Sequence, residues 1–286
     1  MSTLCIYKCP VCNKALIQNG KAYQCSQKHS YDISKYGYVN LLLANQMNSK
    51  EPGDNKEMMT ARHSFLDRGY FEQLSNNINS IVTQHLKACD RQYTVFDVGC
   101  GEGYYTNKLH KALEGCLNVE MYGMDISREA VRLAAKRNRS ISLCVGSVSN
   151  LPLLPHSVDC IVNVFAPFKE EEFSRVLKNK GIVVKVTPGA EHLFGLKEAL
   201  YDNPYLNDEN IPKVSSLEAV ESINIKYDIQ IEDSQDIINL LKMTPYYWNT
   251  NISRVQEFTQ QVSKLDTTLD FVITVFKKNK GEIFIC

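Results

Sequence analysis

The stretch that decides the fold is Val95-Phe96-Asp97-Val98-Gly99-Cys100-Gly101-Glu102-Gly103-Tyr104-Tyr105. A mostly apolar strand pattern that includes an acid leads into glycines at every second position. Tyr105, Leu109, Ala112 and Leu113 then recur at the spacing of one helix face. A strand, a glycine turn and a helix in this order form the first unit of a doubly wound α/β sheet. Ligands of such sheets bind beyond the carboxyl ends of the strands.

The glycines suit a backbone that takes positive φ and lets a ligand approach closely. The dinucleotide-binding fingerprint requires a glycine where this chain has Tyr104, so a pyrophosphate ligand is disfavoured. The pattern Asp-x-Gly-x-Gly-x-Gly instead resembles motif I of the class I S-adenosylmethionine (SAM) methyltransferases. We therefore expect the turn to contact SAM through Asp97, Gly99, Gly101, Glu102 and Gly103.

A second strand is predicted at 120–125, and it ends on an acid 22 positions after Gly103. This is close to the spacing at which a carboxylate meets the hydroxyls of a cofactor ribose. We therefore expect Asp125, together with Ile126, to contact the cofactor. Ser127 then caps a helix rich in cations, for which a solvated outer face is favoured over an RNA groove.

Further strands are predicted at 142–145, 158–165, 181–187, 222–231 and 270–277, the last two as a closing antiparallel pair. In place of the acid that many methyltransferases direct at the adenine amine, this chain has Ser147. The strand that ends at Phe165 leads into Ala166-Pro167-Phe168, where class I enzymes hold the target group. No acid lies between Asn163 and Pro167, so the sequence indicates no general base.

The N-terminal segment has the ligand spacing of a zinc site. Cys9-Pro10-Val11-Cys12 is followed, after twelve residues, by Cys25 and then His29. A CxxC turn places two thiolates on one side of a metal, and the second pair completes a tetrahedron. Three free thiols with a surface histidine are the bland alternative, and Cys5 competes for a ligand place at a poorer spacing. A short hydrophilic segment has no core otherwise, so the metal would supply most of its folding free energy.

Three tyrosines directly follow the predicted zinc site, interleaved with lysines: Tyr31, Tyr36 and Tyr38. Two interpretations stay open, namely stacking on unpaired bases and a hydrophobic cover over the zinc module. The polar residues 45–60, with the turn Pro52-Gly53-Asp54, are predicted to form a linker, and a helix is predicted from Lys56.

Composition indicates an intracellular protein. The sequence has no run of about 18 apolar residues and no signal-peptide pattern, so we expect a cytoplasmic location. The cysteines after Cys25 occur singly, which favours reduced and buried thiols. Net charge is zero, yet residues 1–68 hold nine Lys and Arg against five acids, so a basic head precedes a mildly acidic body.

Several motifs together resemble the RlmA/TlrB family of 23S rRNA (guanine-N1)-methyltransferases over essentially the whole chain. Besides the zinc ligands and the glycine turn, they are Tyr38-Val39-Asn40-Leu41-Leu42, Pro52-Gly53-Asp54, Glu57-Met58-Met59, Ala166-Pro167, Thr187-Pro188-Gly189 with His192, and Met243-Thr244-Pro245. The resemblance implies a zinc module, a class I SAM domain, a homodimer and a guanine target in the loop of hairpin 35.

Residue by residue, the family implies zinc at Cys9, Cys12, Cys25 and His29, and SAM contacts at Gly101, Glu102 and His192. A contact that a tyrosine usually makes falls on Phe71, where its hydroxyl bond is lost, although Tyr70 is adjacent. In one branch of the family, methylation of a neighbouring guanine contributes to macrolide resistance.

The resulting hypothesis is methyl transfer from SAM to guanine N1, with the base unpaired or flipped and held by aromatic residues such as Tyr36, Tyr38, Phe165 and Phe168. We expect a zinc-binding RNA-recognition module at 1–45, a linker and helix at 46–70, and a class I SAM methyltransferase domain at 71–286. The alternatives are a small-molecule SAM methyltransferase with a structural zinc head and a catalytically inactive RNA-binding protein.

Overall fold

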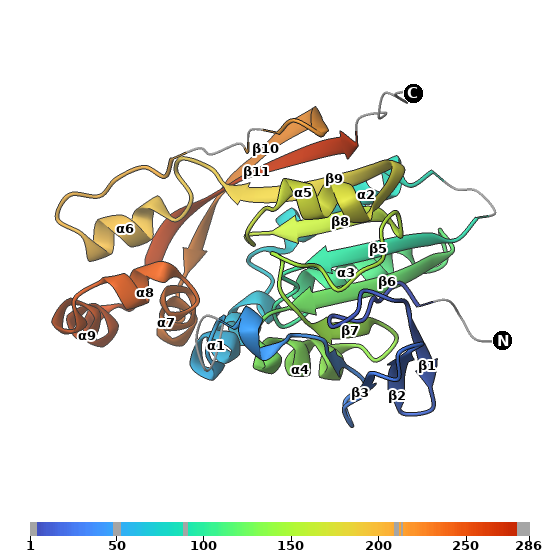
Figure 1. Ribbon diagram of the computed structural model, residues 1–286. Helices are drawn as coiled ribbons and strands as arrows, with labels where there is room; N and C mark the ends of the chain where they lie inside the picture. Colours follow the sequence, from blue (N-terminus) through green and yellow to red (C-terminus); the bar gives the residue numbers. More distant parts are fainter. Residues whose placement is uncertain (1–4, 48–52, 88–90, 209–211, 213, 279–286) are drawn as a thin grey trace.

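The central element of the molecule is a mixed eight-stranded sheet (Figure 1). The computed structural model describes residues 5–47, 53–87, 91–208, 212 and 214–278. Strand order is β10-β11-β9-β8-β5-β6-β7-β4. The parallel strands that carry the site are β5 (Tyr93–Val98), β6 (Val119–Asp125), β7 (Ser142–Val145), β8 (Val158–Val164) and β9 (Leu177–Pro188).

The chain proceeds from β5 outward to β6 and β7, then crosses back to place β8 on the other side of β5. This reversal makes the carboxyl ends of β5 and β8 a topological switch point, where open α/β sheets bind their ligands. The long antiparallel pair β10 (Leu217–Ile231) and β11 (Leu265–Lys278) closes the sheet beyond β9. The expected class I SAM methyltransferase fold is confirmed, including its closing pair.

Alternate residues of the strands enter two separate cores. Val95 of β5 lies in the core that includes residues of α2 (Glu72–His85), α3 (Tyr104–Leu113) and α4 (Arg128–Arg137). The next residue, Phe96, lies in the core that includes α5 (Glu170–Val176) and the N-terminal segment. Strand residues alternate between faces, so these helices cover one face of the sheet while α5 and the N-terminus cover the other.

Four further helices gather at the far end of the β10–β11 pair, on the left of Figure 1. They are α6 (Phe194–Leu200), α7 (Ser234–Lys242), α8 (Pro245–Asn249) and α9 (Ile252–Gln261). The linker helix α1 (Lys56–Asp67) packs against α7, and its first turn is capped by the side chain of Asn55, which accepts a hydrogen bond from Met58 N at 2.9 Å. The predicted helix start at Lys56 is thus confirmed, whereas Pro52 of the predicted turn lies outside the described residues.

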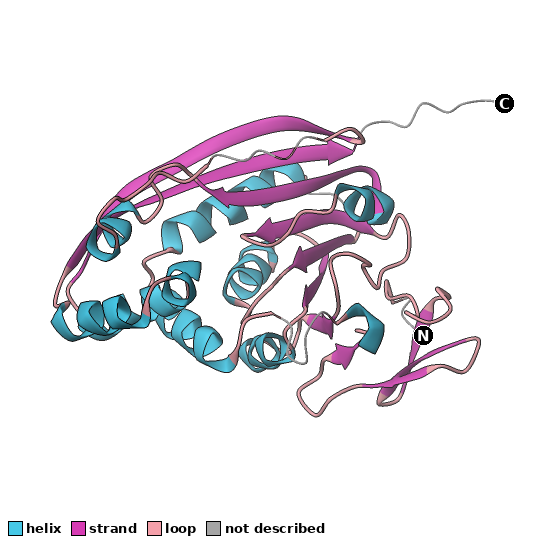
Figure 2. Cartoon of the chain, turned by 60° about the vertical axis from the view of Figure 1, so that its left-hand side comes forward, coloured by secondary structure: helices cyan, strands magenta, loops and turns pink. Residues whose placement is uncertain are grey.

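A small antiparallel sheet forms the N-terminal module, and Figure 2 shows it apart from the main sheet. Its strands are β1 (Leu16–Asn19), β2 (Ala22–Cys25) and β3 (Ser30–Asp32). The module is nevertheless fastened to the main sheet, because β4 (Val39–Asn40) pairs parallel with β7 and Tyr7 is buried beside Tyr122, with ring centroids 5.7 Å apart. After β4 the chain makes one short 3₁₀ turn, η1 (Ala44–Gln46).

Among the described helices, none is long and apolar enough to span a membrane. The cysteines that follow Cys25 are free thiols where the structure describes them. Cys100, Cys144 and Cys160 are buried as expected, whereas Cys116, in the turn after α3, is exposed, so the expectation is wrong for this thiol. Cys89 and Cys286 lie outside the described residues.

The glycine turn predicts a measurable stability difference between two alanine variants. A Cβ at Gly99 would overlap the Cβ of Ala166, whereas one at Gly115 would meet nothing within 4 Å, and both residues have φ near +80°. Both variants carry the strain of a left-handed alanine, but only Gly99→Ala adds a clash, so we expect it to lose about 1–3 kcal/mol more of the free energy of unfolding. Urea denaturation measures both; equal losses would contradict the tight contact.

Candidate metal centre and cofactor site

Two turns of the N-terminal module carry the predicted zinc ligands. The first turn bears Cys9 and Cys12 and is closed by hydrogen bonds from Cys9 N to Lys14 O (2.7 Å) and from Asn13 N to Cys9 O (2.8 Å). The second turn runs from Cys25 to His29 and is closed by a bond from Cys25 N to His29 O at 3.1 Å. Each turn includes one non-glycine residue with a left-handed backbone, Asn13 or Lys28.

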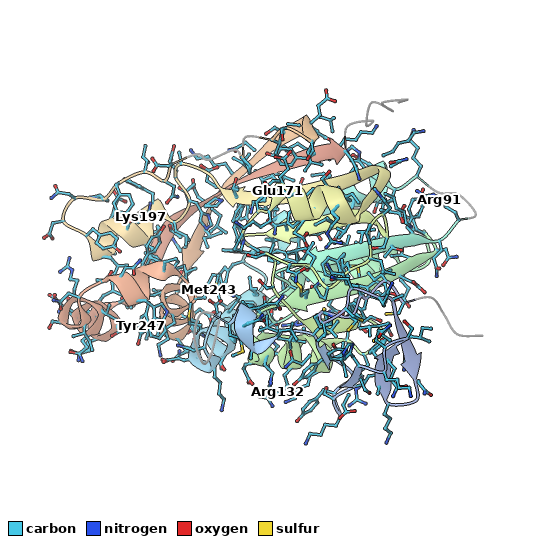
Figure 3. The ribbon with its side chains drawn as sticks, in the orientation of Figure 1. Arg91, Arg132, Glu171, Lys197, Met243 and Tyr247 are labelled. Atoms are coloured by element: carbon cyan, nitrogen blue, oxygen red, sulfur yellow. The ribbon has the colours of Figure 1, made fainter. Side chains whose placement is uncertain are left out.

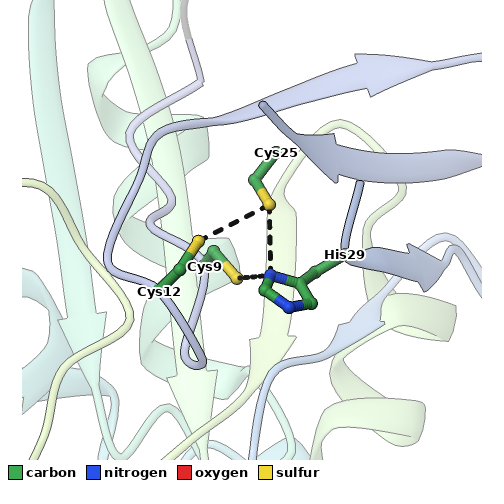
Figure 4. A group of neighbouring side chains, drawn as sticks. All are labelled: Cys9, Cys12, Cys25 and His29. Carbon is green, nitrogen blue, oxygen red and sulfur yellow. Dashed lines mark hydrogen bonds between the residues drawn. The ribbon is translucent and has the colours of Figure 1, made fainter. Parts of the chain in front are cut away.

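The four side chains converge with the dimensions of a tetrahedral metal site (Figure 4). The Sγ atoms of Cys12 and Cys25 are 3.6 Å apart, and His29 Nδ1 lies 3.5 Å from Cys9 Sγ and 3.4 Å from Cys25 Sγ. A zinc ion with Zn–S near 2.3 Å and Zn–N near 2.0 Å gives tetrahedral edges of about 3.5–3.8 Å. These ligand atoms therefore fit zinc.

The thiols of the cluster differ in pKa: for Cys12 the backbone hydrogen bond of Lys14 acts to lower the pKa, but burial and the neighbouring thiols raise it overall. Burial alone would raise the pKa of the Cys9 thiol, but hydrogen bonds from the Tyr31 hydroxyl and from backbone N–H groups of the turn lower it to about 6. Cys5 lies outside the cluster, and burial raises the pKa of its thiol to about 11. Its position outside the cluster makes Cys5 the poorer candidate for a metal ligand.

The three tyrosines have different roles, which the sequence left open. The hydroxyl of Tyr31 lies 3.1 Å from Cys9 Sγ and supports the metal site. Tyr38 is only 8% exposed and belongs to the main core, so the prediction that it holds a base is wrong. Tyr36 is half-buried and lies against cations of α4.

The glycine turn at the end of β5 is held in place by the end of β6. Gly99, Gly101 and Gly103 all have positive φ, between +55° and +85°. The backbone N–H groups of Gly99 and Cys100 both donate to Met124 O, at 2.8 and 2.9 Å. Left-handed residues cannot continue the hydrogen bonding between parallel strands, so Met124 O serves as the acceptor for the first two N–H groups of the turn.

Asp125 joins the turn to the start of α4. Its carboxylate accepts hydrogen bonds from Gly101 N at 3.0 Å and from Ser127 N at 2.8 Å, one on each oxygen. Each carboxylate oxygen can accept a second bond, so both remain able to receive a ribose hydroxyl. Burial raises the pKa of Asp125, while its two backbone donors act in the opposite direction.

Two buried carboxylates beside the turn each retain an oxygen without a partner. Asp97 accepts from Thr106 Oγ1 at 2.6 Å on one oxygen, while Oδ1 has no partner, and burial raises its pKa to about 7. Glu102 is bonded through Oε2 to Arg137 and to His63, while its Oε1 is buried and unpaired. Orphaned acceptors of this kind are rare in a finished core, and they fit a cofactor that carries an amino group and hydroxyls.

The linker covers this site, which the sequence analysis missed. A Cβ on Gly53 would lie 2.9 Å from Ile126 Cγ2, so the linker backbone rests on Ile126. The hydroxyl of Ser127 donates to Asp54 O at 3.0 Å, and Asp54 forms an ion pair with Arg62.

Arg62 in turn extends this cover over the glycine turn. Its Nη1 would lie 3.9 Å from a Cβ built on Gly101, and its Nη2 donates to Met243 O at 3.3 Å, beside α1 in Figure 3. Two motifs of the family resemblance, Pro-Gly-Asp and Met-Thr-Pro, provide Asp54 and Met243 as the partners of Arg62.

Phe71 and His192, which the family resemblance implied, come together on the other side of β5. Their ring centroids are 6.1 Å apart, and both rings pack on Phe271 of β11. Tyr70 does not replace the missing hydroxyl of Phe71, because its own hydroxyl donates to Asp236 Oδ2 at 3.2 Å. That Phe71 and His192 contact the cofactor stays a prediction. The structure adds that both rings pack against Phe271.

The segment after β8 presents an aromatic ring beside His192. Phe165 has a left-handed backbone (φ +52°), is 43% exposed, and lies nearly parallel to the His192 ring at 6.1 Å. A left-handed conformation is a genuine outlier for a bulky residue and persists only where the surroundings enforce it.

A buried lysine under this segment enforces that conformation. Lys185 Nζ donates to Asn163 Oδ1 at 2.7 Å and to Ala166 O at 2.6 Å. The amide of Asn163 donates in turn to Val98 O and to Pro167 O, both at 3.2 Å, which joins the segment to the end of β5. Phe168, by contrast, packs on Phe173 and Phe276.

The fold and these two sites define a class I SAM-dependent methyltransferase with an N-terminal zinc ribbon. A model for the N-terminal domain of RlmA, a zinc ribbon, matches residues 7–50, and a methyltransferase-domain model matches residues 95–185.

Two named relatives show to which family of methyltransferases the chain belongs. The chain is 31% identical to the 23S rRNA (guanine(748)-N1)-methyltransferase of Streptomyces fradiae, over 68% of this chain and 67% of the relative. It is 29% identical, over 96% of this chain and 97% of the relative, to YxjB of Bacillus subtilis, which is provisionally named a 23S rRNA (guanine-N1)-methyltransferase. The chain belongs to the RlmA/TlrB family of 23S rRNA (guanine-N1)-methyltransferases, and its cofactors are SAM and zinc.

The proposed ligand set predicts which cysteine variants lose zinc and which keep it. Replacing one of four ligands leaves too few donors for a tight structural site, so Cys25→Ala should fall from about one zinc per chain to almost none and should melt earlier. Elemental analysis and thermal melting measure both effects. Cys116→Ala removes an exposed thiol, and Cys5→Ala a buried one, so both should keep the metal. Retention of zinc by Cys25→Ala, or its loss from Cys5→Ala, would refute the ligand set.

The cofactor site predicts a strong effect at Asp125. Asp125→Ala removes hydrogen bonds to a carboxylate, each worth about 1.5–3 kcal/mol, so the Kd for SAM should rise about 10- to 100-fold. Isothermal titration calorimetry measures the Kd. Asp202→Ala, which removes a carboxylate 95% exposed to solvent, is the matched control and should bind SAM normally. An unchanged Kd for Asp125→Ala would overturn its assignment.

Proposed function

We propose that this enzyme transfers the SAM methyl group to N1 of a guanine in the loop of hairpin 35 of 23S rRNA. The observation that carries the proposal is the exposed ring of Phe165, which lies at the carboxyl end of β8 next to the glycine turn. Membership of the family supports the rRNA substrate, and the hairpin is what the family resemblance implies. Which neighbouring guanine is methylated decides whether the modification contributes to macrolide resistance.

Guanine N1 lies on the Watson–Crick edge, so the base must be unpaired or flipped before the methyl group can reach it. An exposed aromatic ring with a fixed orientation is a suitable stacking partner for such a base, worth about 1–3 kcal/mol. Phe165 meets this description, because Lys185 and Asn163 hold its backbone and His192 packs against its ring. Alignment of the base with the methyl group would then provide much of the rate.

The N1 proton must leave during the reaction, and neither titratable neighbour of Phe165 is suited to accept it at neutral pH. Burial lowers the pKa of His192 to about 3, and its Nδ1 accepts a hydrogen bond from Asp270 N at 3.4 Å, which assigns the ring proton to Nε2. Burial also lowers the pKa of Lys185 to about 8, so at neutral pH it is mainly charged. We propose that the proton passes to solvent.

The roles of the remaining predicted residues follow from their positions. We propose that Asp97, Gly99, Gly101, Glu102, Gly103, Asp125, Ile126, Phe71 and His192 surround SAM. We propose that Cys9, Cys12, Cys25 and His29 hold a structural zinc ion, because four protein ligands leave no open coordination position. A homodimer and a cytoplasmic location complete the proposal, both supported by the resemblance to the family.

Reverse-transcription stops on methylated RNA test the function directly. With SAM and zinc present, the protein should produce one stop at a guanine in the loop of a protein-free hairpin 35 transcript, because N1-methylguanine cannot pair. The position of the stop identifies the guanine. Phe165→Ala should bind SAM as the wild type does and lose most of the stop.

Two controls separate the alternatives. Omitting SAM should abolish the stop, and a hairpin whose loop guanines are replaced should give none. A wild-type protein that binds SAM but leaves no stop in the hairpin would refute the proposed target. It would instead favour the small-molecule methyltransferase.

A further inference from the structure

Helix α4 carries a row of cations along one face, for which the sequence favoured a solvated outer face over RNA binding. Arg128, Arg132 and Lys136 are spaced four residues apart, which places them on the same face over about 12 Å. Arg128 and Lys136 are exposed, and Arg132 is partly exposed on the outside of the molecule (Figure 3). The opposite side of the helix, with Val131 and Ala134, is buried against the main sheet.

The N-terminal module adds to this row from a different part of the chain. The ring of Tyr36 lies 5.9 Å from the Arg132 guanidinium and 5.4 Å from Lys136 Nζ, and Lys35 Nζ lies 5.2 Å from the same ring. Three cations therefore converge on one aromatic ring. Two of them belong to the methyltransferase domain and one to the zinc module.

Among the described residues, these cations are paired with few carboxylates. Glu129 forms an ion pair with Arg132. Among the residues that the structure describes, Lys35, Arg128 and Lys136 make no ion pair. With Glu129 as the carboxylate that faces Arg132 and Lys136, the four cations keep a positive excess, and an incoming anion relieves their repulsion. Since the chain as a whole has no net charge, the positive charge here is local rather than general.

We propose that Lys35, Tyr36, Arg128, Arg132 and Lys136, which we call the ribbon–helix surface, bind the phosphate backbone of the substrate RNA. The inference rests on the proposed function and deepens it, because it states where the RNA outside the target loop is held. Neither module forms this surface alone. Zinc, by folding the ribbon, fixes the position of Lys35 and Tyr36 beside α4.

The position of the surface suits an RNA substrate. Helix α4 begins directly after Asp125 and Ile126, so the cationic row leads from the β6 end of the cofactor site toward the zinc ribbon. A flexible RNA strand whose target base enters the site can continue along this row. Lysine and arginine that contact phosphates increase affinity without reading sequence, so selection of the guanine is left to the site itself.

The salt dependence of RNA binding tests the inference. Each cation that neutralises a phosphate contributes about 0.7–0.9 to the slope of log K against log salt concentration. The double variant Lys35→Gln/Lys136→Gln should therefore lower the magnitude of that slope by about 1.4–1.8 and weaken binding of a hairpin 35 transcript at low salt at least tenfold. SAM affinity and zinc content should stay unchanged, because neither lysine belongs to those sites.

A matched control removes the same charge elsewhere. Lys87 and Lys277 are exposed and make no ion pair among the described residues, and they lie at the ends of α2 and β11, away from the ribbon. Lys87→Gln/Lys277→Gln should keep the wild-type slope. An unchanged slope in the first variant, or an equal fall in both, would overturn the inference. So would competition by polyglutamate as effective as that by RNA of equal charge, which would indicate an acidic protein partner.

A measurement of stability distinguishes RNA binding by the ribbon–helix surface from a purely structural role. If the Lys35→Gln/Lys136→Gln variant unfolds at lower urea but binds RNA with the wild-type slope, the cluster only fastens the ribbon, and the inference fails. A different outcome would refute the proposed function and not the binding surface. A wild-type protein that binds the transcript through this surface but leaves no reverse-transcription stop would refute the target while leaving the binding surface in place.

Discussion

The carboxylate of Asp125 and the carbonyl of Met124 hold the glycine turn against the end of β6, and the cofactor site depends on this attachment. Three left-handed glycines cannot continue the ladder of strand hydrogen bonds, so their N–H groups need other partners. Gly99 and Gly101 donate to Met124 O and Asp125 of β6, and Gly103 donates to Cys100 O within the turn. Once the turn is fixed, Gly99 leaves room for Ala166 from the end of β8. The ends of three strands thus meet at one point, which becomes the place where cofactor and target can approach each other.

The proposed function relies on a backbone that would be unfavourable elsewhere. Phe165 and Leu193 both adopt a left-handed conformation, and both adjoin His192 in sequence or in space. Such residues cost about 1–3 kcal/mol each and persist where packing leaves no alternative. The charged Lys185, buried but hydrogen-bonded to two acceptors, is part of that packing. The strained backbone and the buried Lys185 together hold the aromatic ring of Phe165 at the surface.

The zinc ribbon is part of the enzyme's core rather than an appended module. Tyr7 and Leu16 share a hydrophobic core with Phe96 and Leu153, and β4 extends the main sheet. The linker that follows covers the glycine turn through Arg62. Metal, ribbon, linker and cofactor site are therefore mechanically connected, so that folding of the ribbon also organises the surface next to the reaction site.

The sequence by itself predicted the main-sheet strands from β5 onward, the glycine turn and the grouping of the four Cys and His side chains, because each depends on spacing between near neighbours in the chain. It also indicated Asp125, since a fixed number of residues separates consecutive strands of one unit. Only the tertiary structure decided that Tyr38 is buried while Tyr36 meets the cations of α4, that Arg62 covers the turn, and that Lys185 supports Phe165. These contacts join residues far apart in sequence, and local periodicity carries no information about which distant side chains packing will bring together.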